Sequence, residues 1–215
     1  MGSSKIRGLY AILDPDLTPP SRIPDLLEKL VRGGCRIFQL RVKKGDDLDA
    51  FNLALRLDRL CRDASALFIV NDRCDIAVAT GADGVHLGQE DLPIEAARTV
   101  LPVGALVGIS AHTPGQATEA ERRGADYIGF GPIFPTETKQ NASPVVGLES
   151  LASVAAKAAI PVVAIGGVTI TGAKSVAEAG ASAIAMISAL ARSLDPAADA
   201  AAVNALFVRD PSFNK

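Results

Sequence analysis

The stretch Gly124-Ala-Asp-Tyr-Ile-Gly-Phe130 contains the unit from which the fold can be predicted: a glycine, a short turn and an apolar strand. The same arrangement returns at Gly81-Ala-Asp-Gly-Val-His-Leu87 and at Gly180-Ala-Ser-Ala-Ile-Ala-Met186. Glycine ends helices readily because it has no Cβ. Each of the three stretches is therefore predicted to lead from a helix into a strand.

Short apolar runs of this kind recur along the whole chain, with helical patterns between them. Each run has four to six residues and is almost continuously apolar, as is typical of parallel strands buried on both faces. The runs are Gly8–Leu13, Ile37–Leu40, Leu67–Val70, Gly84–Leu87, Leu106–Ile109, Tyr127–Phe130, Val162–Ile165 and Ala183–Ile187. This alternation predicts a single-domain (β/α)8 TIM barrel over residues 1–215, with an open doubly wound sheet as the alternative.

The intervening segments have recognisable helix signals. Ile23–Val31 has one apolar face and stops at Gly33-Gly34, and a second helix is predicted over Arg73–Ala79. Thr113-Pro-Gly-Gln116 has the cap, the first-turn proline and the third-position glutamine of a capping box. The helix that begins there is expected to end at Gly124.

Composition excludes several classes of function. The chain has 215 residues, 48% of them hydrophobic, and a net charge of −2, which provides no basic field for nucleic acid. Cys35, Cys61 and Cys74 have no C-x-x-C spacing and are predicted to be reduced thiols of a cytoplasmic protein. No apolar run is long enough for a membrane span, and the start has no apolar signal core.

Polar residues follow seven of the eight predicted strands. Catalytic groups of a barrel collect where its strands end. The segments that follow strands 2 to 8 are Gln39-Leu-Arg-Val-Lys43, Asn71-Asp72, Gly88-Gln-Glu-Asp91, Ser110-Ala-His112, Thr136-Glu-Thr-Lys139, Gly166-Gly167 and Ile187-Ser188. These segments are therefore expected to meet on one rim.

Asp72 and Asp91 follow neighbouring strands, and two hypotheses fit them. Each could cap the helix that comes next, because aspartate is a preferred N-cap. Together they could bind one Mg²⁺, which keeps several waters and also takes phosphate oxygens. The cations Arg41, Lys43 and Lys139 on the same rim favour the metal hypothesis.

Two anion sites are expected on this rim. Arg41 and Lys43 point the same way from an extended segment and suit a diphosphate together with the metal. Gly166-Gly167 and Ile187-Ser188 end strands 7 and 8, where barrels commonly bind a phosphate through backbone N–H groups; a tight turn is the alternative for the glycines. Of the two histidines, His86 is predicted to lie inside the barrel, and His112 could line the site.

These parts indicate a transferase that joins a diphosphate-activated group to a phosphorylated acceptor. The segments at the strand ends, in order and across nearly the whole chain, resemble those of the thiamin-phosphate synthase family; Gly131-Pro-Ile-Phe-Pro-Thr-Glu-Thr-Lys139 is the longest. That family joins hydroxymethylpyrimidine diphosphate to thiazole phosphate and releases diphosphate. The resemblance implies a dissociative route, in which diphosphate leaves, a pyrimidine methyl cation forms, and the thiazole nitrogen captures it.

The resemblance also implies roles for individual residues. One Mg²⁺ is expected on Asp72 and Asp91. The residues that would bind the two substrates are Gln39, Leu40, Arg41, Val42, Lys43, Asn71, Ser110, Thr136, Glu137, Thr138, Lys139, Gly167, Ile187 and Ser188. Arg41, Lys43, Ser110 and Lys139 would act in catalysis. Val42, where the family often has Glu, and Leu40, where Phe is common, depart from its pattern.

Two alternatives stay open. A thiazole tautomerase is related in sequence and fold but needs neither Mg²⁺ nor diphosphate contacts, and it typically has a histidine near the position of Pro132. A non-catalytic binding protein for thiamin intermediates would have lost rim lysines or aspartates. This chain has Pro132 and keeps Asp72, Asp91, Lys43 and Lys139, which argues against both alternatives. The expected small-molecule partners are therefore the two substrates of the synthase, and the sequence leaves a homo-oligomer possible.

Overall fold

The computed structural model describes residues 5–136 and 143–208 of the chain. Its strands are β1 Gly8–Leu13, β2 Ile37–Leu40, β3 Leu67–Asn71, β4 Gly84–Leu87, β5 Leu106–Ala111, β6 Tyr127–Phe130, β7 Val162–Ala164 and β8 Ala183–Met186. Each strand pairs in parallel with the next, and β8 pairs with β1, so the sheet closes into a barrel. The (β/α)8 prediction is confirmed, and the open doubly wound sheet is wrong.

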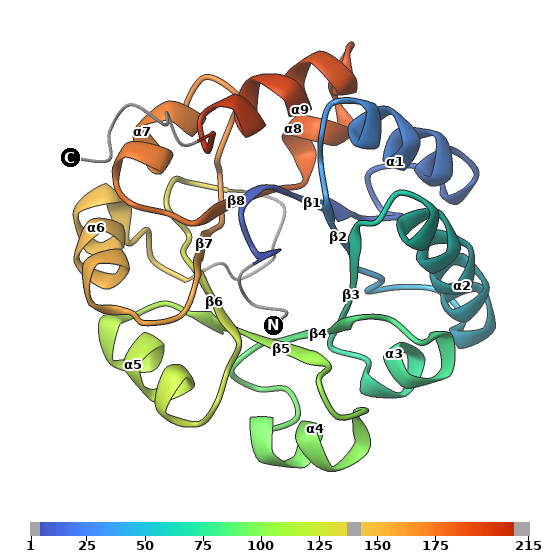
Figure 1. Cartoon of the computed structure of the whole chain (residues 1–215), viewed down its shortest axis with the longest axis horizontal. Helices are drawn as coiled ribbons and strands as arrows, with labels where there is room; N and C mark the ends of the chain where they lie inside the picture. The colour runs from blue at the N-terminus through green and yellow to red at the C-terminus, as the bar shows by residue number, and fades with distance from the viewer. Residues whose placement is uncertain (1–4, 137–142, 209–215) are drawn as a thin grey trace.

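Helices surround the barrel on all sides (Figure 1). They are the 3-10 helix η2 Pro20–Arg22 and the α-helices α1 Ile23–Arg32, α2 Asp47–Asp63, α3 Cys74–Thr80, α4 Ile94–Val100, α5 Pro114–Arg122, α6 Gly147–Lys157, α7 Ala173–Glu178, α8 Ser188–Ala191 and α9 Pro196–Ala205. No helix within residues 5–136 and 143–208 is long and apolar enough to cross a membrane.

Every strand begins at the predicted residue, but several end elsewhere. β3 continues to Asn71 and β5 to Ala111, because Asn71 pairs with His86 and Ala111 with Phe130 in the backbone ladder. β7 stops one residue early because Gly166, just beyond Ile165, has a φ of +94°. Backbone pairing, which ignores side-chain polarity, thus sets these ends.

The turns before the strands have the expected glycine geometry. Gly81, Gly124 and Gly180 have φ angles of 76°, 90° and 93°, a left-handed region that favours glycine. The capping box at α5 also forms: the Thr113 hydroxyl accepts from the Gln116 N–H at 3.2 Å. The Gln116 side chain reaches one residue further back than expected and accepts from the backbone N–H of His112 at 2.7 Å.

Alternate residues of each strand belong to two separate cores. Leu9 and Leu13 of β1 pack outward against the helices, whereas Tyr10 and Ile12 point into the barrel. Because the interior is filled in this way, an inward-pointing polar residue reaches a cavity only near the carboxyl ends of the strands. The fold therefore places the site there.

Candidate active site

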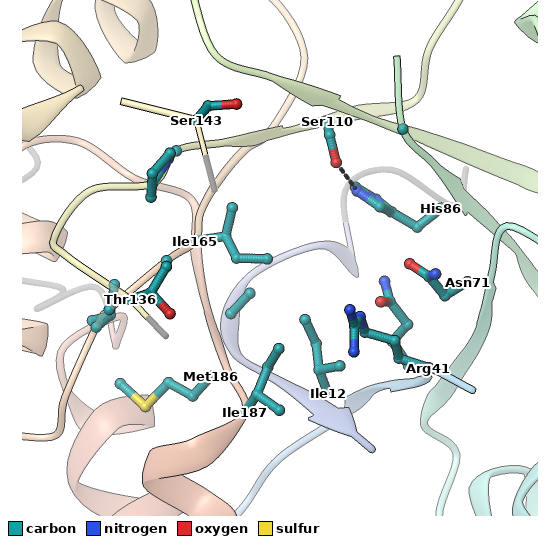
Figure 2. Close-up of a pocket in the computed structure, with 18 of the residues that line it drawn as sticks. Ile12, Arg41, Asn71, His86, Ser110, Thr136, Ser143, Ile165, Met186 and Ile187 are labelled. Atoms are coloured by element: carbon teal, nitrogen blue, oxygen red, sulfur yellow. Dashed lines mark hydrogen bonds between the residues drawn. The ribbon is translucent and has the colours of Figure 1, made fainter. Parts of the chain in front are cut away.

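A cavity of about 180 Å³ lies at the carboxyl ends of the strands. It is lined by most of the predicted site, namely Gln39, Arg41, Lys43, Asn71, Asp72, Asp91, Ser110, Thr136, Gly167, Ile187 and Ser188. Figure 2 shows several of these side chains facing one another across the cavity. The predicted site residues Glu137, Thr138 and Lys139 lie outside the described residues.

Leu40 and Val42 are not brought to this cavity. Both side chains pack with the outer core, between the barrel and the helices, and both line a smaller cavity of about 170 Å³. Successive residues of an extended chain point in opposite directions. Gln39, Arg41 and Lys43 therefore face the main cavity while the two residues between them face away.

Arg41 is held by a carboxylate that the sequence analysis did not include. Its guanidinium donates to Asp14, which follows β1 and is 3% exposed. Asp14 is fixed in turn, because its Oδ1 accepts from the backbone N–H of Asp16 at 2.9 Å. The sequence signal for Asp14 was a charged residue directly after the first apolar run. With Asp14, polar segments follow all eight strands instead of seven.

Lys43, Asp72 and Asp91 form one cluster at the wall of the cavity where β2 to β4 end. Lys43 Nζ donates to Asp72 Oδ2, and the carboxyl groups of Asp72 and Asp91 interact directly with each other. Asp91 Oδ2 also accepts from the backbone N–H of Gly88 at 2.6 Å. Neither aspartate caps a helix, because α3 and α4 have Arg73 and Pro93 at their N-cap positions. The capping hypothesis is therefore wrong for both.

Burial and hydrogen bonding separate the two carboxyl groups. Burial raises the pKa of Asp72 despite its hydrogen bond with Lys43, and the contact with Asp91 adds to the rise. Burial acts on Asp91 as well, but its hydrogen bonds with Asp72 and Gly88 and the charge of Lys43 outweigh it, so the pKa of Asp91 is lowered. The two carboxyl groups of the pair thus differ in acidity, with Asp91 the more acidic.

The donor set fits one hard divalent cation. The described part of the chain contains no group of three or more His, Cys, Asp or Glu side chains that could hold a metal ion. Mg²⁺ needs only one or two carboxylates when waters and substrate phosphates complete its shell. Asp72 and Asp91, whose carboxyl groups lie together at the cavity, could provide these two ligands.

The opposite wall of the cavity is built from backbone. Gly166 and Gly167 have φ angles of 94° and 67°, and they lie against the loop that follows β6. A Cβ on Gly166 would lie 2.5 Å from the Cα of Pro132, and one on Gly167 would lie 2.4 Å from the carbonyl oxygen of Pro135. The glycines thus make a tight turn and also permit this close approach.

The same wall continues through the start of α8. Ile187 and Ser188 line the cavity, and Ile187 accepts from the backbone N–H groups of Leu190 and Ala191, both at 3.1 Å. The first N–H groups of any helix have no intrahelical acceptor. The backbone N–H of Ser188, the first residue of α8, therefore has no acceptor within the helix and lies in the same cavity lining as Gly167.

Both histidines line the cavity, and each has a fixed ring. His86 is 7% exposed, and its Nε2 lies 2.9 Å from Ser110 Oγ (Figure 2). His112 donates from Nδ1 to the carbonyl oxygen of Gly131 at 2.6 Å. The interior position predicted for His86 and the cavity position of His112 are confirmed.

The cavity also has an apolar side. Ile12, Ile165 and Ile187 gather there (Figure 2). These side chains can pack on a flat, uncharged ring while the polar walls hold its substituents. Sequence analysis did not select Ile12 and Ile165, because apolar residues at the ends of strands resemble ordinary core.

A family model and individual relatives of this chain point to the same family. The family model described as Thiamine monophosphate synthase matches residues 9–190. A thiamine-phosphate synthase of Chlorobium limicola is 48% identical, with 84% of this chain and 86% of that protein covered. One of Methanospirillum hungatei is 46% identical, with 89% and 93% covered.

Comparison with solved structures points to the same family. A thiamine phosphate pyrophosphorylase from Pyrococcus furiosus superimposes with a TM-score of 0.85 and 36% identity, with 94% of this chain and 95% of that chain covered. A 3-hexulose-6-phosphate synthase superimposes with a TM-score of 0.69 at 20% identity, over 94% of this chain and 100% of that one. The second likeness concerns the barrel fold alone.

Proposed function

The chain belongs to the thiamine monophosphate synthase family, and from this premise we propose how its cavity performs the reaction. It is a transferase that makes thiamine phosphate. The proposed substrates are hydroxymethylpyrimidine diphosphate and thiazole phosphate. The observation that carries the assignment of sites is the cluster of Lys43, Asp72 and Asp91 at one wall of the cavity.

We assign the diphosphate to this wall. Arg41, Lys43, Asn71 and Lys139 would bind its oxygens, with one Mg²⁺ on the two aspartates. The described charges support a metal, because Arg41 and Lys43 already face the three carboxylates of Asp14, Asp72 and Asp91. With Lys139 the three cations would only balance the three carboxylates, so the charge of a bound diphosphate would still need a further cation such as Mg²⁺.

The chemistry follows from what the cavity provides. The bond between the pyrimidine methylene carbon and the diphosphate oxygen breaks, and its electron pair leaves with diphosphate. The thiazole nitrogen then donates its lone pair to that carbon. When bound, Mg²⁺ would stabilise the negative charge on the leaving oxygens. Lys43 and Lys139 would stabilise the same charge.

The acceptor phosphate is assigned to the wall of glycines. Backbone N–H groups at Gly167, Ile187 and Ser188 would bind it, and the hydroxyls of Thr136 and Thr138 would add contacts. Ser110 would help to hold the pyrimidine. The apolar side chains opposite would pack on the rings and exclude water, which could otherwise capture the methyl cation.

We also propose that the protein works in the cytoplasm, with the three cysteines reduced. Cys35, Cys61 and Cys74 are all buried and free. Burial raises the pKa of Cys35 to about 12, which suits an inert thiol rather than a reactive one. A homo-oligomer remains a proposal that sedimentation of the purified protein would test.

The test is product formation by the purified protein from both substrates with Mg²⁺. We expect thiamin phosphate and diphosphate in equal amounts, with release of diphosphate dependent on thiazole phosphate. Tautomerisation of the thiazole precursor without diphosphate release would assign the chain to the tautomerase instead. Tight binding of both substrates without turnover would make it a binding protein.

A further inference from the structure

Five polar side chains form one hydrogen-bonded chain through the barrel, here called the interior chain. Gln39 Nε2 donates to the Tyr10 hydroxyl at 2.8 Å, which lies 2.9 Å from the Tyr127 hydroxyl. That hydroxyl lies 3.1 Å from His86 Nδ1, and His86 Nε2 lies 2.9 Å from Ser110 Oγ. Both ends, Gln39 and Ser110, line the cavity. The interior chain thus connects two substrate contacts through residues with no assigned role.

The number of hydrogen atoms in the interior chain determines that one of its two ends donates inward and the other accepts. Each of the four contacts needs one hydrogen atom between its two heavy atoms. The hydroxyls of Tyr10 and Tyr127 and a neutral His86 ring have one each, which gives three. The fourth must come from one end, so either the Gln39 amide or the Ser110 hydroxyl donates inward and the other accepts.

The three rings between the ends are held in place, so only hydrogen atoms can move in that part of the interior chain. Tyr10 and Tyr127 are 1% and 0% exposed, and a Cβ on Gly108 would lie 2.0 Å from the Tyr127 ring. The rings of His86 and Tyr127 pack with centroids 5.5 Å apart. Burial raises the pKa of both tyrosines well above the usual range, so each hydroxyl keeps its hydrogen. A change of direction therefore means rotated hydroxyls, a different His86 tautomer and a Gln39 amide turned by 180°, so that Oε1 instead of Nε2 meets the Tyr10 hydroxyl.

We propose that the interior chain can run in two directions and that the pyrimidine ring of the donor substrate selects one. In the forward direction Gln39 donates inward, His86 has its hydrogen on Nε2, and Ser110 donates to the ligand. Gln39 then presents its carbonyl oxygen to the cavity. In the reverse direction Ser110 donates inward, His86 has its hydrogen on Nδ1, and the Gln39 amide can donate to the ligand.

An aminopyrimidine edge suits the forward direction. Its amino group donates and the neighbouring ring nitrogen accepts, so it needs one protein acceptor and one protein donor. In the forward direction the cavity lining offers both, the acceptor at Gln39 Oε1 and the donor at the Ser110 hydroxyl. A pyrimidinone, with an oxo group and a ring N–H, has the opposite pattern and suits the reverse. Tyr10, Tyr127 and His86 are thus positioning residues that couple the two contacts; the identity of the ligand rests on the proposed function.

The test is the tautomer of His86, measured by ¹⁵N NMR of the ring nitrogens. The labelled protein is saturated with the aminopyrimidine diphosphate or with its 4-oxo analogue, without thiazole phosphate. His86→Gln identifies the signals, since the chain has only two histidines. We expect the hydrogen on Nε2 with the amino ligand and on Nδ1 with the oxo ligand. The same tautomer with both ligands, or an imidazolium with either, would overturn the proposal.

Tyr127→Phe breaks the interior chain at its centre. We expect the tautomer of His86 to stop responding to the ligand and KM for the pyrimidine diphosphate to rise about tenfold, the size of one ordinary hydrogen bond. KM for thiazole phosphate should not change. Thr80→Val, which removes a buried hydroxyl bonded to Ile76 in α3, is the control and should change neither. A tautomer that still switches in Tyr127→Phe would contradict the coupling.

Tyr10→Phe provides a second variant if Tyr127→Phe does not fold. It disconnects Gln39 but leaves Tyr127, His86 and Ser110 joined. We expect His86 to switch as in the wild type, with KM for the pyrimidine diphosphate raised about tenfold. Loss of switching would contradict the proposal. A wild type that makes no thiamin phosphate would instead refute the proposed function, because the NMR measurement needs only bound ligand.

Discussion

One wall of the cavity is formed by charged side chains and the other by backbone. At the ends of β2 to β4, the charged wall consists of Arg41, Lys43, Asp72 and Asp91, whose side chains are paired with one another or with Asp14. At the ends of β7 and β8, the backbone wall consists of residues 166–167 and 187–188. Ion pairs can be exchanged for a substrate and a metal, whereas close-packed backbone cannot move aside. Substitutions in the charged wall should therefore affect chemistry first, and those in the backbone wall stability first.

Asp72→Asn should have the largest effect. Asp72 has a φ of 62°, which asparagine also tolerates, so the backbone should be retained while one carboxylate is lost. We expect turnover to fall by about 100-fold or more, because the charge on the leaving diphosphate loses its counter-ion. The measurement is kcat at saturating substrates and Mg²⁺, with the melting temperature alongside.

Asp75→Asn is the matched control for that experiment. Asp75 is an exposed aspartate of α3, paired with Arg73 and outside the cavity lining. It should keep wild-type turnover. Near-normal turnover in Asp72→Asn would remove Asp72 from the metal site and with it the main distinction between the two walls.

Lys139→Ala comes next and tests to which wall this lysine belongs. If Lys139 binds the leaving diphosphate, kcat should fall about 10- to 100-fold while KM for thiazole phosphate changes little. Steady-state kinetics with each substrate varied in turn provide the measurement. A raised KM for thiazole phosphate with kcat unchanged would move Lys139 to the acceptor site.

Gly167→Ala tests the backbone wall. Its new Cβ would meet the carbonyl oxygens of Pro135 and Phe134 at 2.4 and 2.6 Å, in addition to the left-handed φ. Gly104→Ala is the control, since Gly104 has a φ of 89° and no atom within 4 Å of the added Cβ. Conformation alone should cost the control about 1 kcal/mol, or roughly 2–4 °C of melting temperature.

We expect Gly167→Ala to lose at least about twice the control's melting temperature, because steric overlap adds to the strain. Its KM for thiazole phosphate should also rise. Equal losses in the two variants would mean that the loop after β6 yields easily, and that the backbone wall is no more rigid than the charged one.

Ser188→Ala should have the smallest effect. The proposed role of Ser188 is a backbone contact at the start of α8, so loss of its hydroxyl should change kcat/KM by less than about threefold. A severe loss in the same steady-state assay would show that the hydroxyl itself binds the phosphate. The backbone wall would then resemble the charged wall in depending on side chains.

The fold was largely predictable because its signals are local. Each strand begins with an apolar run, and glycine turns such as those at Gly81 and Gly124 precede two of them, so the starts are correct. Strand ends were less predictable, because Asn71 and Ala111 continue the ladder through backbone pairing alone. Polarity of the next residue does not report that pairing.

The site was predictable where residue type decides the role. Charged residues after strands marked the charged wall, and only Asp14 was missed there. The interior chain could not be predicted, because Tyr10 and Tyr127 lie 117 residues apart and meet only through the register of a closed barrel. In sequence, each of them resembles an ordinary core aromatic residue.

The most direct test of the two-wall account is calorimetric titration of the wild type, Asp72→Asn and Gly167→Ala with Mg²⁺-diphosphate and, separately, with thiazole phosphate. The account predicts that Asp72→Asn loses most of its affinity for Mg²⁺-diphosphate but binds thiazole phosphate like the wild type, and that Gly167→Ala does the reverse. Loss of both ligands in both variants, or of the wrong ligand in either, would contradict it.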